Sequence, residues 1–370
     1  MLRNWFLVRS GAVTRLAIVL WIALAVMGMT TMAYAGSDGR RGTAGASELL
    51  IPVGPRGSAL GGTIVADVLG IESMYWNPAG LGGSAGTEVL VTHTQYFADM
   101  KLNYAGITTK AGGFGTLGLS VKILSVGDVI VTTEQAPDGT GEILHPTFST
   151  IGMAWGRSFT DRVNFGAIAN WVHEDVANNI ADGLAFDFGV QYDADWRGLR
   201  LGMVLRNMGT SMEFSGPGFE TSGRDPNADP NAGPRTVSFS SDAFEMPSHL
   251  VLSASSALMS SNQQKLLALA AFQSNNFSGD QIRGGLEWGY REMATVRASY
   301  FGTFTGTIDP SSGEETVAFE GGDDLQEGLA LGAGFKTRFG DAGKMGVDLC
   351  WRPARTQFDD IIEFGLSLSF

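Results

Sequence analysis

The sequence predicts an all-β fold: a transmembrane, antiparallel, up-and-down β-barrel of about 14 strands with a small, partly helical N-terminal plug. Three observations predict it. Charged residues make up only 17% of the chain, against about 25% in an ordinary soluble domain, and 51 residues are glycine. Apolar residues alternate with small or polar ones after residue 87, as in strands whose two faces meet different surroundings. Short connections alternate with long ones, which is typical of outer-membrane barrels.

The C-terminal segment shows the alternation most clearly. From 362 to 370 every even-numbered residue is Ile, Phe or Leu, whereas the odd-numbered residues are Glu, Gly and Ser. A soluble β-sandwich also alternates, but its solvent face would usually carry lysine and glutamate in place of glycine and serine. Aromatic residues also gather near predicted strand ends, as the interfacial girdles of a membrane barrel require: Trp171, Tyr192, Trp288, Tyr290 and Trp351. The pattern therefore favours the membrane barrel.

The connections predict how the barrel is oriented. Most are tight turns, whereas those near 127–146, 208–247, 303–326 and 352–361 are long. Short turns face the periplasm and long loops face outward, and an even number of strands places both chain ends in the periplasm. Two of the long loops are acidic and contain no lysine or arginine, and solvation or a cationic partner outside the cell would explain them. The net charge of −13 disfavours nucleic acid as a partner.

The first 35 residues predict a signal peptide. Three arginines without any acidic residue accompany the apolar run 16–29, and Ala33-Tyr34-Ala35 forms a small-x-small cleavage site. A transmembrane anchor is the alternative, but the run is shorter than the roughly 20 apolar residues that span a bilayer. We therefore divide the chain into a signal peptide (1–35), a plug (36–86) and a barrel (87–370). Cys350 is the only cysteine, so no internal disulfide can form.

The plug segment shows no strand pattern. Apolar residues at helical spacing between 60 and 69 predict a short helix, and the stretch YWNPAGL follows at 75–81. Because proline fixes its own φ and restricts the preceding residue, Asn-Pro marks a turn or a helix start. We expect Asn77 to cap a short helix that begins at Pro78, and the two aromatic residues to anchor the plug. The predicted plug motif is Tyr75, Trp76, Asn77, Pro78, Ala79, Gly80 and Leu81.

The inward positions of the predicted strands make the lumen polar. They carry opposite charges that could pair with each other or with the plug: Asp187, Arg200, Arg206, Arg283, Glu287, Arg297, Asp348 and Arg352. A fatty-acid conduit needs a mostly apolar pocket. The lumen therefore favours a plugged barrel that works through its loops or partners.

Enzyme patterns in the sequence lack the required context. The G-x-S-x-G match at 82–86 has no preceding strand, and the G-x-G-x-x-G match at 113–118 precedes an alternating strand and not a helix. The four histidines are scattered without ligand spacing. The acidic stretch 225–233 has proline where a calcium loop requires glycine, so a plain loop is preferred to a weak surface ion site. We predict no enzymatic activity, no cofactor and no metal site.

The stretches SALGG (58–62) and YWNPAGL (75–81), ahead of the predicted barrel, resemble the PorV/PorQ family. That family is related to the FadL-type long-chain fatty acid transporters, whose N-terminal hatch carries a similar Asn-Pro-Ala. The resemblance implies an integral protein of the outer membrane, in contact with its lipid. It also implies a role in type IX secretion, with secreted proteins that carry C-terminal signal domains and secretion-system subunits as partners. The alternative is FadL-like transport of long-chain fatty acids or other hydrophobic compounds.

Overall fold

The computed structural model describes residue 40 and residues 42–370, except for 197, 224–234, 240, 309–314, 321–327, 340–342 and 354–358. The predicted signal peptide and the whole stretch 225–233 lie outside the described residues.

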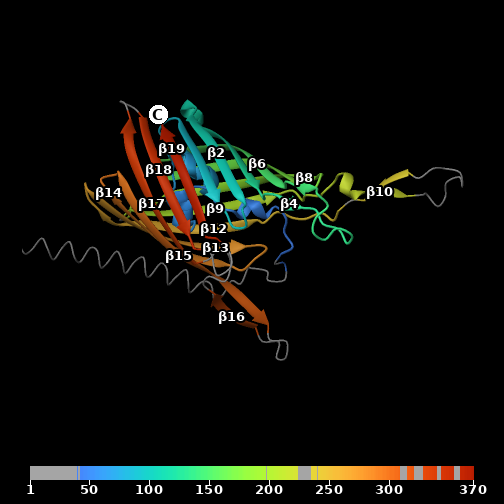
Figure 1. The fold of residues 1–370 in the computed structure, drawn as a ribbon. Helices are drawn as coiled ribbons and strands as arrows, with labels where there is room; N and C mark the ends of the chain where they lie inside the picture. The colour runs from blue at the N-terminus through green and yellow to red at the C-terminus, as the bar shows by residue number, and fades with distance from the viewer. Residues whose placement is uncertain are drawn as a thin grey trace, which may run out of the picture.

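A closed, antiparallel barrel of 14 strands confirms the predicted fold class (Figure 1). Each strand pairs with its neighbours in chain order, and the first strand closes the barrel on the last, with Glu88 opposite Ser369. The strands are β1 (Glu88–Gln95), β2 (Lys101–Lys110), β3 (Thr116–Ser125), β6 (Thr147–Ser158), β7 (Val163–Val176), β8 (Asn179–Asp193), β9 (Leu199–Gly209), β12 (His249–Ser260), β13 (Gln264–Asn275), β14 (Gln281–Tyr290), β15 (Ala294–Ile308), β17 (Gly328–Phe339), β18 (Gly343–Arg352) and β19 (Ile361–Ser369).

The two ends of the barrel differ. The long connections follow β3, β9, β15 and β18 and leave from one end, here called the loop end; β1 begins and β19 ends at the other, the turn end. Short hairpins extend the loop end, with β10 and β16 lying beyond the barrel (Figure 1). Their strands are β4 (Val129–Ile130), β5 (Ile143–Leu144), β10 (Glu220–Gly223), β11 (Arg235–Ser238) and β16 (Glu315–Glu320).

One predicted loop is partly strand. Residues 303–308 were expected in a long loop, but β15 continues through them and pairs with β16, with Thr303 opposite Glu320 and Ile308 opposite Glu315. Thr303 still pairs with Gln281 of β14, and the residues after it lie past the part of β15 that pairs with β14 and β17. β15 therefore extends beyond the barrel wall as one strand of a hairpin with β16.

The outward face of the barrel is apolar, as the alternation predicts. In β19, Phe364 is 53% exposed whereas the adjacent Glu363 is fully buried in the lumen. Equivalent outward residues on the other strands are large and exposed, among them Ile107, Leu119, Met153, Phe186, Phe188, Met203, Leu286, Val296, Phe335 and Val347. An apolar outer band around a closed barrel is the surface that a lipid bilayer covers. The described chain contains no helix with the length and apolar character needed to cross a membrane.

A charge on this outer face should destabilise the barrel. Phe364→Arg places a guanidinium in the middle of β19, where we expect a loss of about 2–4 kcal/mol in the free energy of unfolding in lipid. Urea titration of the barrel refolded in phospholipid vesicles, followed by tryptophan fluorescence, measures it. Asp161→Arg, in the exposed turn between β6 and β7, is the control and should change the free energy little. Equal effects of the two substitutions would contradict a lipid-covered face.

The plug fills the lumen with short helical turns (blue in Figure 1). They are η2 (Ser47–Leu50), α2 (Pro55–Ala59), η3 (Thr63–Ala66), η4 (Gly70–Glu72), α3 (Ser73–Trp76) and η5 (Pro78–Gly83), and two further turns, η6 (Gly112–Phe114) and η7 (Pro217–Phe219), lie in connections. The short helix expected between 60 and 69 is reduced to the single turn η3. Gly61 and Gly62 adopt φ of 59° and 75°, a left-handed conformation that ends the helical path between α2 and η3.

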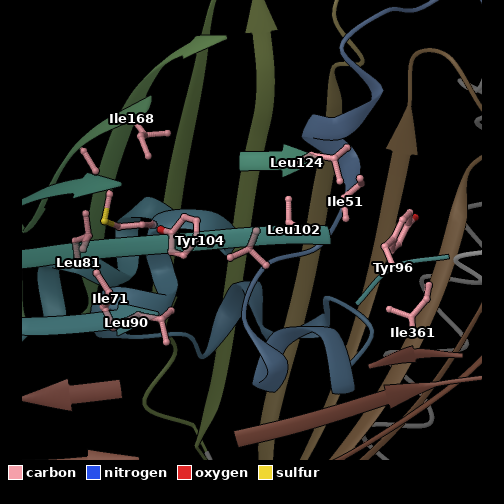
Figure 2. Close-up of a cluster of buried hydrophobic side chains, with 13 residues drawn as sticks. Ile51, Ile71, Leu81, Leu90, Tyr96, Leu102, Tyr104, Leu124, Ile168 and Ile361 are labelled. Atoms are coloured by element: carbon pink, nitrogen blue, oxygen red, sulfur yellow. The ribbon is translucent and has the colours of Figure 1, made fainter. Parts of the chain in front are cut away.

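The hydrophobic core lies between the plug and the wall. Figure 2 shows Ile51, Ile71 and Leu81 of the plug facing apolar side chains of the strands. The wall contributes Leu90, Leu102, Tyr104, Leu124, Ile168 and Ile361, and Tyr96 from the connection after β1 joins them. The barrel is therefore a packed body, in which the plug supplies the centre of the core.

Candidate functional site

The wall meets the plug through inward-facing glycines, here called the glycine belt. A Cβ on Gly166 of β7 would lie 2.1 Å from the Pro78 carbonyl oxygen, and one on Gly189 of β8 would lie 1.8 Å from Asn77 Oδ1. No side chain fits at these distances, so the belt lets the plug backbone touch the wall. Gly156 faces Pro78 and Leu81 in the same way. Other parts of the plug are faced by Gly118, Gly202, Gly285, Gly332 and Gly365.

Asn77 joins three parts of the structure. Its Oδ1 accepts a hydrogen bond from Ala79 N at 3.1 Å and caps η5, which begins at Pro78. Its Nδ2 donates to the carbonyl oxygens of Val65 in η3 (2.8 Å) and Val190 in β8 (3.3 Å). The side chain is fully buried, so it fixes the plug to the wall without help from solvent.

The aromatic pair of the motif holds the loop-end part of the plug. The Tyr75 hydroxyl donates to the carbonyl oxygens of Leu49 (3.2 Å) and Ile51 (2.9 Å). Burial raises the pKa of Tyr75 above its ordinary value, so the hydroxyl remains a donor. The Trp76 ring lies edge-on to it, with centroids 5.0 Å apart. The remaining residues of the motif, Ala79, Gly80 and Leu81, are buried against the plug and the wall.

Removing the amide of Asn77 should loosen the plug. Asn77→Ala loses the cap and both bonds to carbonyls, and we expect the ion conductance of the barrel to rise in planar lipid bilayers. Asn77→Asp keeps the acceptor for Ala79 N but loses the donor, so its conductance should lie between those of wild type and Asn77→Ala. Asn164→Ala, at the turn end of β7, controls for the loss of a half-buried amide. An Asn77→Ala barrel as tight as wild type would contradict this role.

Charged side chains tie the turn-end half of the plug to the wall. Arg56 of α2 contacts Glu287 of β14, with Nε 2.9 Å from Oε2, and also lies 3.3 Å from Asp67 and 3.5 Å from Glu72. Burial by itself would lower the pKa of Arg56, but the carboxylates around it raise the pKa well above its ordinary value. Arg56 is therefore charged and fully compensated.

Four of the predicted lumen charges belong to this network. Arg297 contacts Glu287 (2.7 Å) and Asp348 (2.6 Å). Arg200 contacts Asp67 of the plug at 2.8 Å. In this half of the lumen these arginines each have a carboxylate partner, so their charges cancel.

A second group of predicted lumen charges lies toward the loop end. Arg206, Arg283 and Arg352 line a cavity of about 80 Å³ between the plug and the wall. The plug side contributes Tyr75 and Trp76, and the wall side includes Phe301, Val251, His249, Gln273, Asn275 and Gln281. No aspartate or glutamate is among the described residues that line it. The cavity is therefore both aromatic and cationic.

Two of these arginines lie against rings. The guanidinium carbon of Arg206 is 4.0 Å from the centroid of the Tyr75 ring, and that of Arg283 is 5.5 Å from the Phe301 ring. Arg283 also donates to the Gly61 carbonyl oxygen at 3.0 Å and to the side chain of Gln281. These contacts orient the guanidinium groups along the cavity wall.

Asp187, the last predicted lumen charge, has a local role. It lies at a β-bulge between Phe186 and Phe188, where β8 and β9 change register. Its Oδ1 accepts from Asn207 N at 2.6 Å, and Asn207 has a φ of 55°. The carboxylate therefore satisfies the backbone of the bulge.

Three charged residues of the interface between plug and wall were not predicted from the sequence. Arg56 and Asp67 are charged residues within a segment of small and apolar residues, which was the available signal for buried partners. Lys122 of β3 is buried and donates from Nζ to the carbonyl oxygens of Glu48 (2.7 Å) and Ile51 (2.9 Å). Among the described residues, no cluster of His, Cys, Asp and Glu side chains could hold a metal ion.

The sequence matches no family model and no curated protein. Among solved structures, the CymD monoaromatic hydrocarbon channel aligns over 87% of this chain and 98% of its own, at 14% identity and a TM-score of 0.53. The Pseudomonas putida toluene transporter TodX aligns over 85% and 96%, at 12% identity and a TM-score of 0.51. The chain has the fold of these channels. The likeness is one of fold, and membership of the PorV/PorQ family stays a prediction.

Proposed function

We propose that the protein is a non-enzymatic channel that carries small, partly apolar compounds across the outer membrane, with the turn end of the barrel in the periplasm. The cavity between plug and wall supports this proposal, because the rings of Tyr75, Trp76 and Phe301 meet polar groups there. Small-molecule sites usually combine an apolar lining with a few polar groups. The two channels that share the fold are named for monoaromatic hydrocarbons and toluene, which are single-ring compounds.

The inward charges, which argued against a conduit for apolar compounds, are paired at the turn end of the barrel. Read from the sequence, the inward charges favour a role through loops and partners over a conduit. In the structure, Arg200, Arg297 and their carboxylate partners neutralise each other at the turn end. The aromatic cavity lies apart from them, toward the loop end. A polar lumen and a site for a single-ring compound can therefore occur in one barrel.

Uptake by cells tests the channel. A Gram-negative host that produces the protein should take up labelled toluene several-fold faster than the same host with an empty vector. Ser278→Trp, in the connection that borders the cavity, should return uptake to the empty-vector rate because the indole fills the site. Asn276→Trp is the matched control, since it lies in the same connection, is exposed and does not line the cavity. Uptake by wild type equal to that of the empty vector would overturn the channel.

The loop-end hairpins favour a second candidate, the binding of exported proteins in type IX secretion. The hairpin β10–β11 projects beyond the barrel wall (Figure 1). Met212 and Phe244 bridge the base of this connection, so residues 213–243 can be deleted while the bridge is kept. A mild-detergent pull-down should recover proteins that share a C-terminal domain or a secretion-system subunit, and the deletion should abolish their recovery. A pull-down that returns the barrel alone would remove this candidate.

A further inference from the structure

The two halves of the lumen differ in whether carboxylates surround their arginines. At the turn end, Arg56, Arg200 and Arg297 contact carboxylates at 3.5 Å or less. The cavity at the loop end brings three arginines together and has no carboxylate among its described lining residues. Positive charge is therefore concentrated around a space that can accept a ligand.

Two of the cavity arginines are buried with unused donors. Arg352 is 4% exposed and Arg206 is 7% exposed. Within the described part of the chain, Nε and Nη2 of Arg352 and Nε of Arg206 have no hydrogen-bond partner. Leaving buried N–H groups of a charged side chain without acceptors costs free energy, and an anion in the cavity would supply those acceptors.

Two buried carboxylates are close enough to these arginines to interact with their charges, Asp187 with Arg206 and Glu363 with Arg352. Asp187 accepts from Asn207 N at 2.6 Å within the bulge of β8 and β9. Glu363 accepts from Gly54 N of the plug, also at 2.6 Å, through Oε1. Neither residue lines the cavity. An anion bound there therefore has no competing carboxylate within the site.

The aromatic residues add a second chemical requirement. Tyr75, Trp76 and Phe301 present their rings to the same cavity. The indole Nε1 of Trp76 is buried and, among the described residues, has no acceptor. An engineered, enclosed cavity of about 150 Å³ binds benzene. This cavity of about 80 Å³ is smaller but partly open, so a single-ring acid is the upper limit in size and would extend into the opening.

We propose that this cavity is a binding site for small aromatic carboxylates. The carboxylate is held by the guanidinium groups of Arg352 and Arg206, whose planar donors match its two oxygens. The ring lies among Trp76, Tyr75 and Phe301. This inference rests on the proposed channel and names its substrate class, which differs from a neutral hydrocarbon by one negative charge.

Binding to the purified, full-length barrel in detergent tests the proposal. Equilibrium dialysis with labelled benzoate should show saturable binding, and unlabelled benzyl alcohol should compete at least tenfold more weakly. Arg352→Gln and Arg206→Gln should each weaken benzoate binding at least tenfold. Arg338→Gln, an exposed arginine at the turn end of β17, is the matched control and should leave binding unchanged. A shift of the unheated band on electrophoresis confirms that each variant is folded.

Several results would overturn the proposal. Benzyl alcohol that competes as well as benzoate would exclude recognition of the charge, and acetate or inorganic phosphate that competes as well would exclude recognition of the ring. Equal benzoate binding by Arg352→Gln would exclude this cavity. The channel can fail separately: benzoate binding that depends on Arg352, without uptake above the empty vector, leaves the site and removes the transport. Toluene uptake without benzoate binding would leave the channel and remove the carboxylate site.

Discussion

Gly166→Val should displace the plug from the barrel wall. A Cβ at this position would lie 2.1 Å from the carbonyl oxygen of Pro78 and 2.2 Å from its carbonyl carbon. These are backbone atoms of the plug, which cannot move aside as the end of a side chain can. Overpacking of a core costs about 1–3 kcal/mol, and a clash of two backbones should reach the upper part of this range. We expect the conductance in planar bilayers to rise several-fold and the temperature at which the barrel unfolds on electrophoresis to fall.

Gly284→Val is the matched control for this substitution. Gly284 lies on β14 and a Cβ there would have no heavy atom within 4 Å. It adds the same valine to a strand of the same barrel without meeting the plug. If both variants conducted alike, or if Gly166→Val stayed as tight as wild type, the glycine belt would not be what seats the plug.

The sequence could predict the barrel because the bilayer imposes a simple rule on every strand. Alternate residues must be apolar, and a shift by one residue would turn every side chain to the wrong face. The inward placement of Arg206, Arg283 and Arg352 follows from the same alternation. That these three residues surround one cavity does not follow from it. Their convergence depends on which strands become neighbours and on where each strand begins relative to the plug.

The plug was less predictable, since its conformation depends on glycine and on contacts distant in sequence. Helical spacing over 60–69 could not reveal that Gly61 and Gly62 would take left-handed φ values. The abundance of glycine was visible, but its purpose needs the partner, as at Gly166 and Pro78. The ion pair of Arg56 with Glu287 spans 231 residues, so no local pattern could indicate it.

Loss of the Arg56 charge should be the most damaging change to the polar side of the plug. Arg56→Met leaves the carboxylates of Glu287, Asp67 and Glu72 near one another in a buried site without their shared cation. Breaking a buried ion pair from one side typically costs about 3–5 kcal/mol. We expect the urea midpoint of the barrel in vesicles to fall and protease to cut the plug of the folded barrel. Arg162→Met removes an exposed arginine paired with Asp195 and should cost less than about 1 kcal/mol.

The double variant Arg56→Met/Glu287→Met separates the loss of a bond from the cost of an unpaired charge. In Arg56→Met, Glu287 keeps Arg297 as its partner, but the site holds one negative charge too many. If that excess charge causes the penalty, removing the Glu287 carboxylate should restore part of the stability. Arg297 then keeps Asp348 as its partner, so the second substitution strands no new cation. A double variant less stable than Arg56→Met would contradict this account, because the pair would then contribute through packing and not through charge. Partial recovery would mean that Arg56 is required chiefly because it neutralises the carboxylates around it.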